Sequence, residues 1–516
     1  MNPALLLPWL FLGLQESPAQ ELESARRALA AGQTEMAITA LEPLASADDP
    51  RAWLLLAKAY RQSHRLEKGW ALAESLAARF LAGEITLSAE LAQAMAPLFA
   101  EQGRLARAQE VLSRALRVYP EEPDLHLEQA RLHFSLLEYS AAVEACRKAQ
   151  ALGKDSSALY YVLGTSLAVL GERAEAEPTL QRSLEKNPRH VDARFELAKL
   201  KLRAKEYAKA IAELKRCLVL QPRHLAALFN LGNALVQSGN REEGRRTLKA
   251  FQHYNRLAEQ EKDLRDTVRV NREDQQALVE LALFYVNQKQ PRRALPLLER
   301  AMARELDRTE LLVGFGKSLS AVGRDAEARD TLTRALQLDA KLTPVRILLV
   351  EILARLNELD AAGRMLASCK KQVSPSRWFL AQGEIAARRG LGWEGAAPAI
   401  RKSIEADPSN LEAILAWVDL AVAYQKVALA ESALRAWGGA HPRNPRFPLG
   451  LGVLALEGKR TREALQALDT ARRLDPWFPA THTFLAQWYR RTGDLPQSLE
   501  TEKHARYLQI LWGQSS

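Results

Sequence analysis

The chain has 516 residues, of which 47% are apolar, only 7% are aromatic and 26% are charged. Ala and Leu dominate the apolar residues and favour helices, and charges are too interspersed with them for wholesale disorder. The 72 basic and 62 acidic residues leave a net charge of +10, which alone does not indicate a nucleic-acid-binding protein. Three widely spaced cysteines argue against a disulfide framework or a cysteine metal site. The composition predicts an all-α chain and favours an elongated array over three or four globular domains.

The N-terminus carries an apolar run at residues 4–14, followed by Ser-Pro-Ala at residues 17–19. This pattern is typical of a secretory signal peptide, although no basic residue precedes the run and Pro8 interrupts it. The alternative is an apolar tail that packs on the first helix. The run is shorter than the ~18 residues that a membrane span needs, and no other segment suggests a span. We expect residues 1–19 to be removed, giving a periplasmic or secreted protein; otherwise the protein is cytoplasmic.

A period of 34 residues then runs through the sequence. It is marked by Pro188 and Pro222, and again by Pro408, Pro442 and Pro476. With these prolines at position 32, Ala recurs at position 20, Leu at position 24 and Gly at position 8. Two antiparallel helices per repeat explain the spacing, because small residues at positions 8 and 20 allow the helices to approach closely. The recurring residues are Ala176, Ala210, Ala294, Ala328, Ala362, Ala430 and Ala464; Leu180, Leu214, Leu248, Leu298, Leu332, Leu366, Leu434 and Leu468; and Gly164, Gly232, Gly316 and Gly452.

This pattern resembles the tetratricopeptide repeat family, and the segments 159–167 and 226–235 are similar to its consensus. The resemblance implies an all-α, right-handed superhelical α-solenoid of helical hairpins. We expect about fourteen repeats, beginning at residues 18, 50, 89, 123, 157, 191, 225, 275, 309, 343, 377, 411, 445 and 479.

Residues 259–274 fit no repeat, and ten of these sixteen residues are charged. We interpret the segment as an extended second helix, or a helix plus loop, that separates a block at 20–258 from a block at 275–512, each of about seven repeats. It is either a hinge or a solvated insertion without a role.

The last residues of the chain are apolar, although such arrays usually end in a polar capping helix. This end either covers the last groove or meets a partner, which includes self-association of the chain. The residues concerned are Leu508, Ile510, Leu511 and Trp512.

Catalytic chemistry is not predicted. The nine histidines are scattered, with no His and carboxylate cluster that would hold a metal ion. Residues 390–395 match a dinucleotide-binding string, but helical repeats flank it where such a loop needs a preceding strand. Since no catalytic, cofactor-binding or metal-binding residues emerge, we expect a protein that is not an enzyme and needs no cofactor.

By resemblance to the family, positions 5, 6 and 9 of each repeat face a concave groove. Aromatic side chains supply contact area for a peptide, Asn can hydrogen-bond its backbone, and a Lys can meet its carboxylate. The full set of basic residues of a carboxylate clamp is absent. The alternative is ordinary repeat surface. The candidate groove residues are Tyr161, Phe195 and Phe229 at position 5, Glu196 and Asn230 at position 6, and Thr165, Lys199 and Asn233 at position 9.

The sequence therefore favours a scaffold or adaptor that binds a protein or peptide partner in this groove. One alternative is a basic solenoid that binds an anionic polymer, because Lys and Arg gather around residues 188–224. The polymer in that alternative is a polysaccharide or a nucleic acid, although a nucleic acid is not the expected partner of this chain. The other alternative is an accessory repeat module of an enzyme complex.

Overall fold

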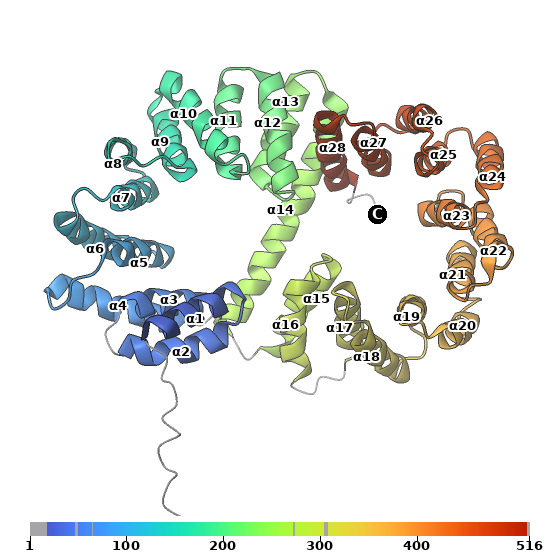
Figure 1. Cartoon of the computed structure of the whole chain (residues 1–516), viewed down its shortest axis with the longest axis horizontal. Coiled ribbons are helices and arrows are strands. Elements are labelled where there is room, and N and C mark those ends of the chain that lie inside the picture. Colours follow the sequence, from blue (N-terminus) through green and yellow to red (C-terminus); the bar gives the residue numbers. More distant parts are fainter. Residues whose placement is uncertain (1–17, 47–49, 64–65, 272–273, 304–307, 513–516) are drawn as a thin grey trace, which may run out of the picture. The chain divides into compact units, whose positions relative to one another are not determined.

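The computed structural model describes residues 18–46, 50–63, 66–271, 274–303 and 308–512 (Figure 1). Within these ranges all regular elements are α-helices and none is a strand, which confirms the all-α prediction. The predicted signal peptide, residues 1–19, lies outside the described residues except for its last two, which begin helix α1. Among the described residues, no helix combines the length and the apolar character that crossing a membrane requires.

The chain divides into two compact units, which are described separately: unit 1 covers residues 1–213 and unit 2 covers residues 214–516. The division falls inside helix α12 (Tyr207–Leu220). The predicted boundary between two blocks of repeats, at residues 259–274, lies within unit 2 and stays a prediction.

The described helices form hairpins of two consecutive helices. In the first part of the chain these are α1 and α2 (Pro18–Ala30, Thr34–Ser46), α3 and α4 (Pro50–Gln62, Leu66–Ala82), α5 and α6 (Ala89–Glu101, Leu105–Val118), α7 and α8 (Pro123–Ser135, Tyr139–Ala151), α9 and α10 (Ser157–Leu170, Arg173–Lys186), and α11 (Val191–Arg203) with α12. They continue with α13 and α14 (Leu225–Gln237, Arg241–Val270), α15 and α16 (Gln275–Asn287, Pro291–Met302), α17 and α18 (Thr309–Ala321, Asp325–Leu338), and α19 and α20 (Thr343–Arg355, Leu359–Ser368). The last four are α21 and α22 (Pro375–Arg388, Gly392–Ala406), α23 and α24 (Leu411–Ala423, Val427–Ala440), α25 and α26 (Arg446–Glu457, Thr461–Leu474), and α27 and α28 (Pro479–Arg491, Leu495–Trp512).

The first helices begin where the 34-residue period predicts. Twelve of the fourteen start at the predicted residue, whereas α21 begins at Pro375 and α25 at Arg446 in place of 377 and 445. The prediction of a repeated helical hairpin is therefore confirmed.

Glycine at position 8 allows the two helices of a hairpin to touch. A Cβ atom added to Gly164 would lie 2.8 Å from Cγ of Leu180, and one added to Gly316 would lie 2.5 Å from Cγ of Leu332. Both distances are shorter than carbon atoms tolerate, because optimal contacts lie near ~3.5 to 4.0 Å. The Leu at position 24 thus occupies the space that a side chain at position 8 would fill. The same relation holds between Gly232 and Leu248 (2.6 Å) and between Gly452 and Leu468 (2.7 Å).

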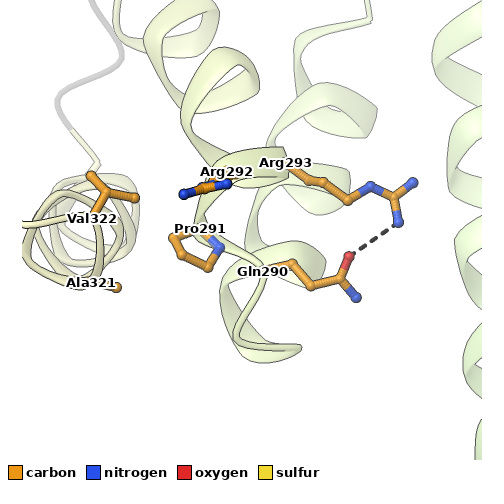
Figure 2. A pocket seen from close by; sticks show the side chains of 6 residues that line it. All are labelled: Gln290, Pro291, Arg292, Arg293, Ala321 and Val322. Atoms are coloured by element: carbon orange, nitrogen blue, oxygen red, sulfur yellow. Dashed lines mark hydrogen bonds between the residues drawn. The ribbon is translucent and has the colours of Figure 1, made fainter. Parts of the chain in front are cut away.

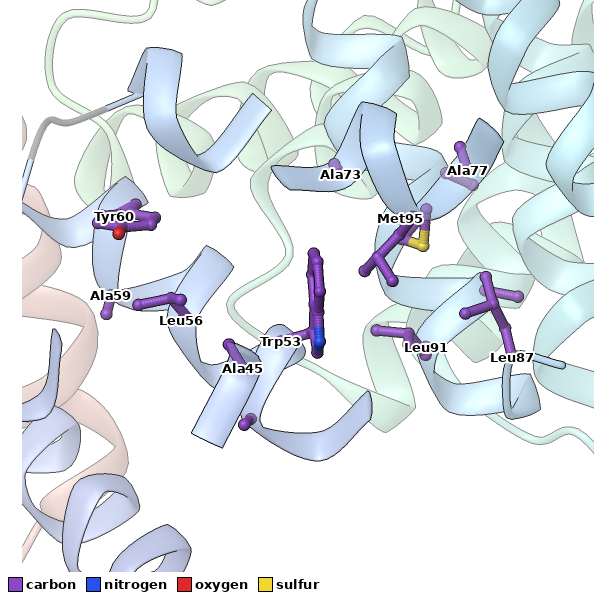
Figure 3. Packing of buried hydrophobic residues seen from close by; sticks show 14 of the residues in the cluster. Ala45, Trp53, Leu56, Ala59, Tyr60, Ala73, Ala77, Leu87, Leu91 and Met95 are labelled. Carbon is purple, nitrogen blue, oxygen red and sulfur yellow. The ribbon is translucent and has the colours of Figure 1, made fainter. Parts of the chain in front are cut away.

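Neighbouring hairpins share their hydrophobic core. At the start of unit 1, Trp53 of α3 lies between the core residues of its own helix and Met95 of α5 (Figure 3). One buried cluster runs from Leu22 to Leu132. A single hairpin buries only one side of its helices, so stacking on the next hairpin completes the core.

Side-chain caps hold the starts of several first helices. His190 Nδ1 accepts a hydrogen bond from the backbone N–H of Ala193 at 3.2 Å, and His224 Nδ1 accepts one from Ala227 at 3.1 Å. Ser156, Asp274 and Asn410 cap α9, α15 and α23 in the same way. A histidine caps only with its Nδ1 unprotonated, so the cap formed by His190 depends on pH.

The charged segment after residue 258 continues helix α14, which is 30 residues long. Leu264 and Val268 of this extension pack against the buried cluster of α15 and α16. Glu261 accepts hydrogen bonds from the Tyr285 hydroxyl at 3.1 Å and from Arg293 at 2.7 Å. The segment up to Val270 is therefore an extended second helix that packs on the next hairpin, and its action as a hinge stays a prediction.

The apolar C-terminal helix packs inside unit 2. Helix α28 contacts α27 and also α14, beside which it lies in Figure 1. Leu508 and Ile510 are only 1% and 5% exposed. These two side chains face the interior of unit 2, and the self-association predicted for this end stays a prediction.

Candidate functional site

Helices α9 and α11 carry the candidate residues of unit 1, and the two helices are in contact. Both are first helices of their hairpins. Tyr161, Phe195, Glu196 and Lys199 are half-buried, as expected for side chains at the margin of a helix that packs on one side.

On α11, three neighbouring side chains form one group. Lys199 Nζ lies 2.8 Å and 2.9 Å from the two carboxylate oxygens of Glu196, and 5.7 Å from the centre of the Phe195 ring. The spacing of three and four residues brings these side chains together on one helical face. The sequence suggested that Lys199 could meet a partner's carboxylate; in the structure its charge is matched by Glu196.

On α9, Tyr161 belongs to a continuous row of rings that the sequence analysis did not find. Its ring centre lies 6.1 Å from that of Phe134 of α7 and 4.8 Å from that of His190, the cap of α11. Phe134 in turn contacts Tyr139 at 5.8 Å. Burial, with the negative charges of Asp192 and Glu196, raises the pKa of Tyr161 to about 12, so its hydroxyl remains protonated at neutral pH.

Thr165 departs from the expectation that it lies on the open surface. Its side chain is only 5% exposed, and its Oγ1 has no hydrogen-bond partner among the described residues. A partner on the surface of α9 would therefore not reach this hydroxyl.

The remaining candidates lie on α13 in unit 2. Phe229 is 47% exposed, and the other side of its ring packs against Phe251 of α14 at 5.3 Å between ring centres. Asn230 Nδ2 donates to the backbone carbonyl of Ala226 in its own helix at 2.7 Å, and Asn233 is half-buried. Phe229 is thus the most exposed of the predicted aromatic residues.

The structure also reveals acidic residues at position 9 of three successive repeats in unit 2. These are Glu351 of α19, Glu384 of α21 and Asp419 of α23, and each of these helices contacts the next. Partial desolvation and then repulsion by Glu351 raise the pKa of Glu384, although its side chain reaches solvent. Partial desolvation, followed by repulsion from the negative charge of Glu457, raises the pKa of Asp419. Reading position 9 in the frames that begin at 343 and 411 would have found Glu351 and Asp419, but the frame predicted at 377 places Ile385 at position 9.

Metal-ligating and thiol side chains give no candidate site in the part of the chain that the structure describes. The described residues contain no group of three metal-ligating side chains that could hold an ion. All three cysteines are buried, and burial raises the pKa of Cys146 to about 12, which keeps its thiol unreactive.

The cavity shown in Figure 2, about 500 Å³ in volume, is lined by residues of the second helix of one hairpin and the first helix of the next. Its lining contains neither a carboxylate nor a nucleophile, and Arg293 within it donates to Gln290 Oε1 at 3.1 Å. The lining residues are Gln290, Pro291, Arg292, Arg293, Ala321 and Val322.

Comparisons with known proteins agree with the repeat. A family model described as tetratricopeptide repeat matches residues 94–157, 161–224 and 415–476, and a second model with that description matches residues 201–261. No curated protein emerges as a relative of this chain.

Several solved structures are similar to parts or most of the chain. YrrB, described as a TPR protein with an unusual peptide-binding site, is 22% identical over 37% of this chain and 91% of its own, with a TM-score of 0.28. Yeast Tom70 is 13% identical over 76% of this chain and 95% of its own, with a TM-score of 0.39. A structure described as Naa15/Naa10 bound to HypK-THB is 14% identical over 96% of this chain and 99% of its own, with a TM-score of 0.30. None of these similarities is close enough to transfer a site or a partner.

Proposed function

We propose that this chain, which is a tetratricopeptide repeat protein, is a non-enzymatic scaffold that binds a protein partner through the exposed faces of its first helices. Arrays of stacked helical hairpins present extended surfaces of this kind, and binding is their usual role. No enzyme domain accompanies the repeats in the described residues.

The observation that carries the proposal is the exposure of Phe229. A large aromatic side chain that keeps 47% of its surface in water, on a first helix and beside two asparagines, is a typical anchor for a partner. In unit 1 the group formed by Phe195, Glu196 and Lys199 offers an apolar ring next to a paired acid and base. Such a surface suits a peptide segment better than a free carboxylate, because Lys199 is already matched.

The charge arrangement favours a protein over an anionic polymer. Several of the basic residues around residues 188–224 are paired with carboxylates: Lys209 Nζ lies 2.8 Å from Glu206, and Lys215 Nζ lies 2.7 Å from Glu243. Paired cations contribute little to the release of counterions that drives binding to phosphate or sulfate polymers.

The test is site-specific photo-cross-linking in cells that produce the protein. A photoreactive phenylalanine at position 229 or 195 should capture the same protein partner, identified by mass spectrometry. The matched control is position 424, where Tyr424 is also exposed (37%) but follows the end of helix α23. Equal capture at position 424, or capture of no defined protein at 229 and 195, would contradict the proposal.

Affinity for the captured partner then provides the second measurement. Truncation of an interface aromatic to Ala commonly costs ~1 to 2 kcal/mol, so Phe229→Ala and Phe195→Ala should each weaken binding by about 5- to 30-fold. Tyr424→Ala should leave affinity unchanged.

A further inference from the structure

Helix α28 makes contacts in unit 2 that span most of that unit's sequence. The Tyr507 hydroxyl lies 3.0 Å from Oγ1 of Thr247, across 260 residues of chain. Lys215 Nζ of α12 lies 5.0 Å from the centre of the Tyr507 ring, and the Tyr254 hydroxyl donates to the backbone carbonyl of Ile510 at 3.4 Å. We call this contact of α28 with α12 and α14 the clasp.

A histidine pair lies at the clasp. The ring centre of His504 of α28 is 4.7 Å from that of His482 of α27 and 6.2 Å from that of Tyr507. His482 is 6% exposed and donates its Nε2 proton to the backbone carbonyl of Pro476 at 2.9 Å. Two imidazoles this close cannot both carry a charge without repelling each other in a partly dry site.

The charged groups around His504 come from every helix packed against it. Lys215 of α12 disfavours a proton on His504, whereas Glu243 of α14 favours one, and the two form an ion pair at 2.7 Å. A charge on His482 of α27 repels a charge on His504. Burial first, and then Arg472 near the end of α26, lower the pKa of His482, whereas its hydrogen bond to Pro476 and the charge of Asp475 act in the opposite direction. Tyr507, buried and protonated, adds no charge. Among the described residues, Glu243 is the group that attracts a proton to His504, and its charge is shared with Lys215.

We propose that the clasp is a proton-released latch, which holds while His504 is neutral and opens when His504 takes up a proton. Opening would free α28 from α14 and move His504 into water. The inference does not rest on the proposed function, since it concerns only contacts within unit 2.

The direction of the pH dependence follows from the two states of His504. Burial, then His482 and Lys215, lowers the pKa of His504 to about 4 in the closed clasp, whereas an exposed histidine titrates near ~6.5. Since the closed form has the lower pKa, closure is fully favoured above pH ~6.5 and is lost as the pH falls towards 4. The equilibrium constant for closure should fall by up to ~10-fold per pH unit in this window, or about 300-fold in total.

The test measures the distance between α14 and α28 directly. Cysteines for spin labels replace Lys249 of α14 and Gln509 of α28, which are both exposed, in the full chain. The three native cysteines are buried and should remain unlabelled. Pulsed electron paramagnetic resonance at pH 7.5 should give one short distance, and a longer one should replace it between pH 6 and 4.5 while the helical circular dichroism stays constant.

Two variants separate His504 from other acid-sensitive groups. His504→Phe keeps an aromatic ring against His482 and should hold the short distance down to pH 4.5. His441→Phe removes an exposed histidine of the same unit and should open as the parent protein does. Opening of His504→Phe at the parent's pH would assign the effect to another group and overturn the proposal.

A short distance in the parent protein at all pH values would also overturn it, as would lengthening that occurs only together with loss of helical signal. If His504→Phe does not close at pH 7.5, His504→Gln takes its place. Its amide can hydrogen-bond but not titrate, so a pH-dependent distance in that variant would refute the latch.

Discussion

Replacing Gly316 with Ala tests whether the contact at position 8 holds a hairpin together. The added Cβ would lie 2.5 Å from both Cγ and Cδ2 of Leu332, and Leu332 is fully buried, so it has no free space to move into. One helix of the hairpin must therefore shift or Leu332 must leave its rotamer.

The expected change in the free energy of unfolding for Gly316→Ala is the difference between two opposing effects. Ala in a helix interior is more favourable than Gly by ~1 kcal/mol, whereas inserting a methyl group into a packed core costs ~1 to 3 kcal/mol. With two carbon contacts at 2.5 Å the cost falls at the upper end, so Gly316→Ala should destabilise the α17 and α18 hairpin by ~1 to 2 kcal/mol. Gly363→Ala in α20 is the matched control: its nearest atom is the mobile end of Arg389 at 3.4 Å, so it should stabilise by ~0.5 to 1 kcal/mol.

Hydrogen exchange read by mass spectrometry is the appropriate assay, because an array of repeats need not unfold in one step. Amides of α17 and α18 should exchange about 5- to 30-fold faster in Gly316→Ala, and Leu332→Val should restore part of the protection when added to it. If Gly316→Ala protects these helices as well as the parent protein does, position 8 does not control helix contact.

Two further predictions concern titrating groups. Burial lowers the pKa of His190 below its ordinary value near ~6.5, so the cap that His190 forms on α11 is present above that pH and is lost as the pH falls. The hydrogen-exchange protection of α11 amides should therefore drop from pH 7.5 to pH 5 in the parent protein. It should not drop in His190→Asn, because the Asn side chain caps the helix without titrating. An equal drop in His190→Asn would show that another group is responsible. Since burial raises the pKa of Cys146 to about 12, this thiol should resist an aromatic disulfide reagent at pH 8 until urea unfolds the chain; rapid labelling of Cys146 in the native protein would contradict its burial.

The hairpins could be predicted because most repeats place Ala at position 20 and Leu at position 24 on one packed face, and the period of 34 makes this pattern visible. The frame predicted at 377 was out by one residue. Gly383, not Glu384, is the position 8 glycine there, because its Cβ would meet Ile400 at 2.5 Å. Hydrophobic periodicity indicates the two helices but does not fix their register to a single residue. The turn between them, residues 389–391, is as long as most other turns within hairpins.

The candidate site could be predicted only to the level of helix faces. A position rule places Lys199 and Glu196 on one face but does not say that they pair with each other, and it does not show that Thr165 is buried by its surroundings. The acidic row was missed because the shifted frame moved Glu384 from position 9 to position 8. The clasp could not be predicted from the sequence, because the period relates neighbouring repeats and does not indicate a contact between residues 260 positions apart.

The clasp also has a consequence for how this gene can change by duplication. An open array tolerates the gain or loss of a whole hairpin near its end, because each hairpin depends only on its neighbours. Between α14 and α28 there are seven hairpins, α15 to α28, and the last must arrive where Tyr507 meets Thr247. Each hairpin adds a fixed rotation and translation, so inserting or deleting one would carry α28 away from α14. Related sequences that keep the clasp residues should therefore also keep this number of hairpins.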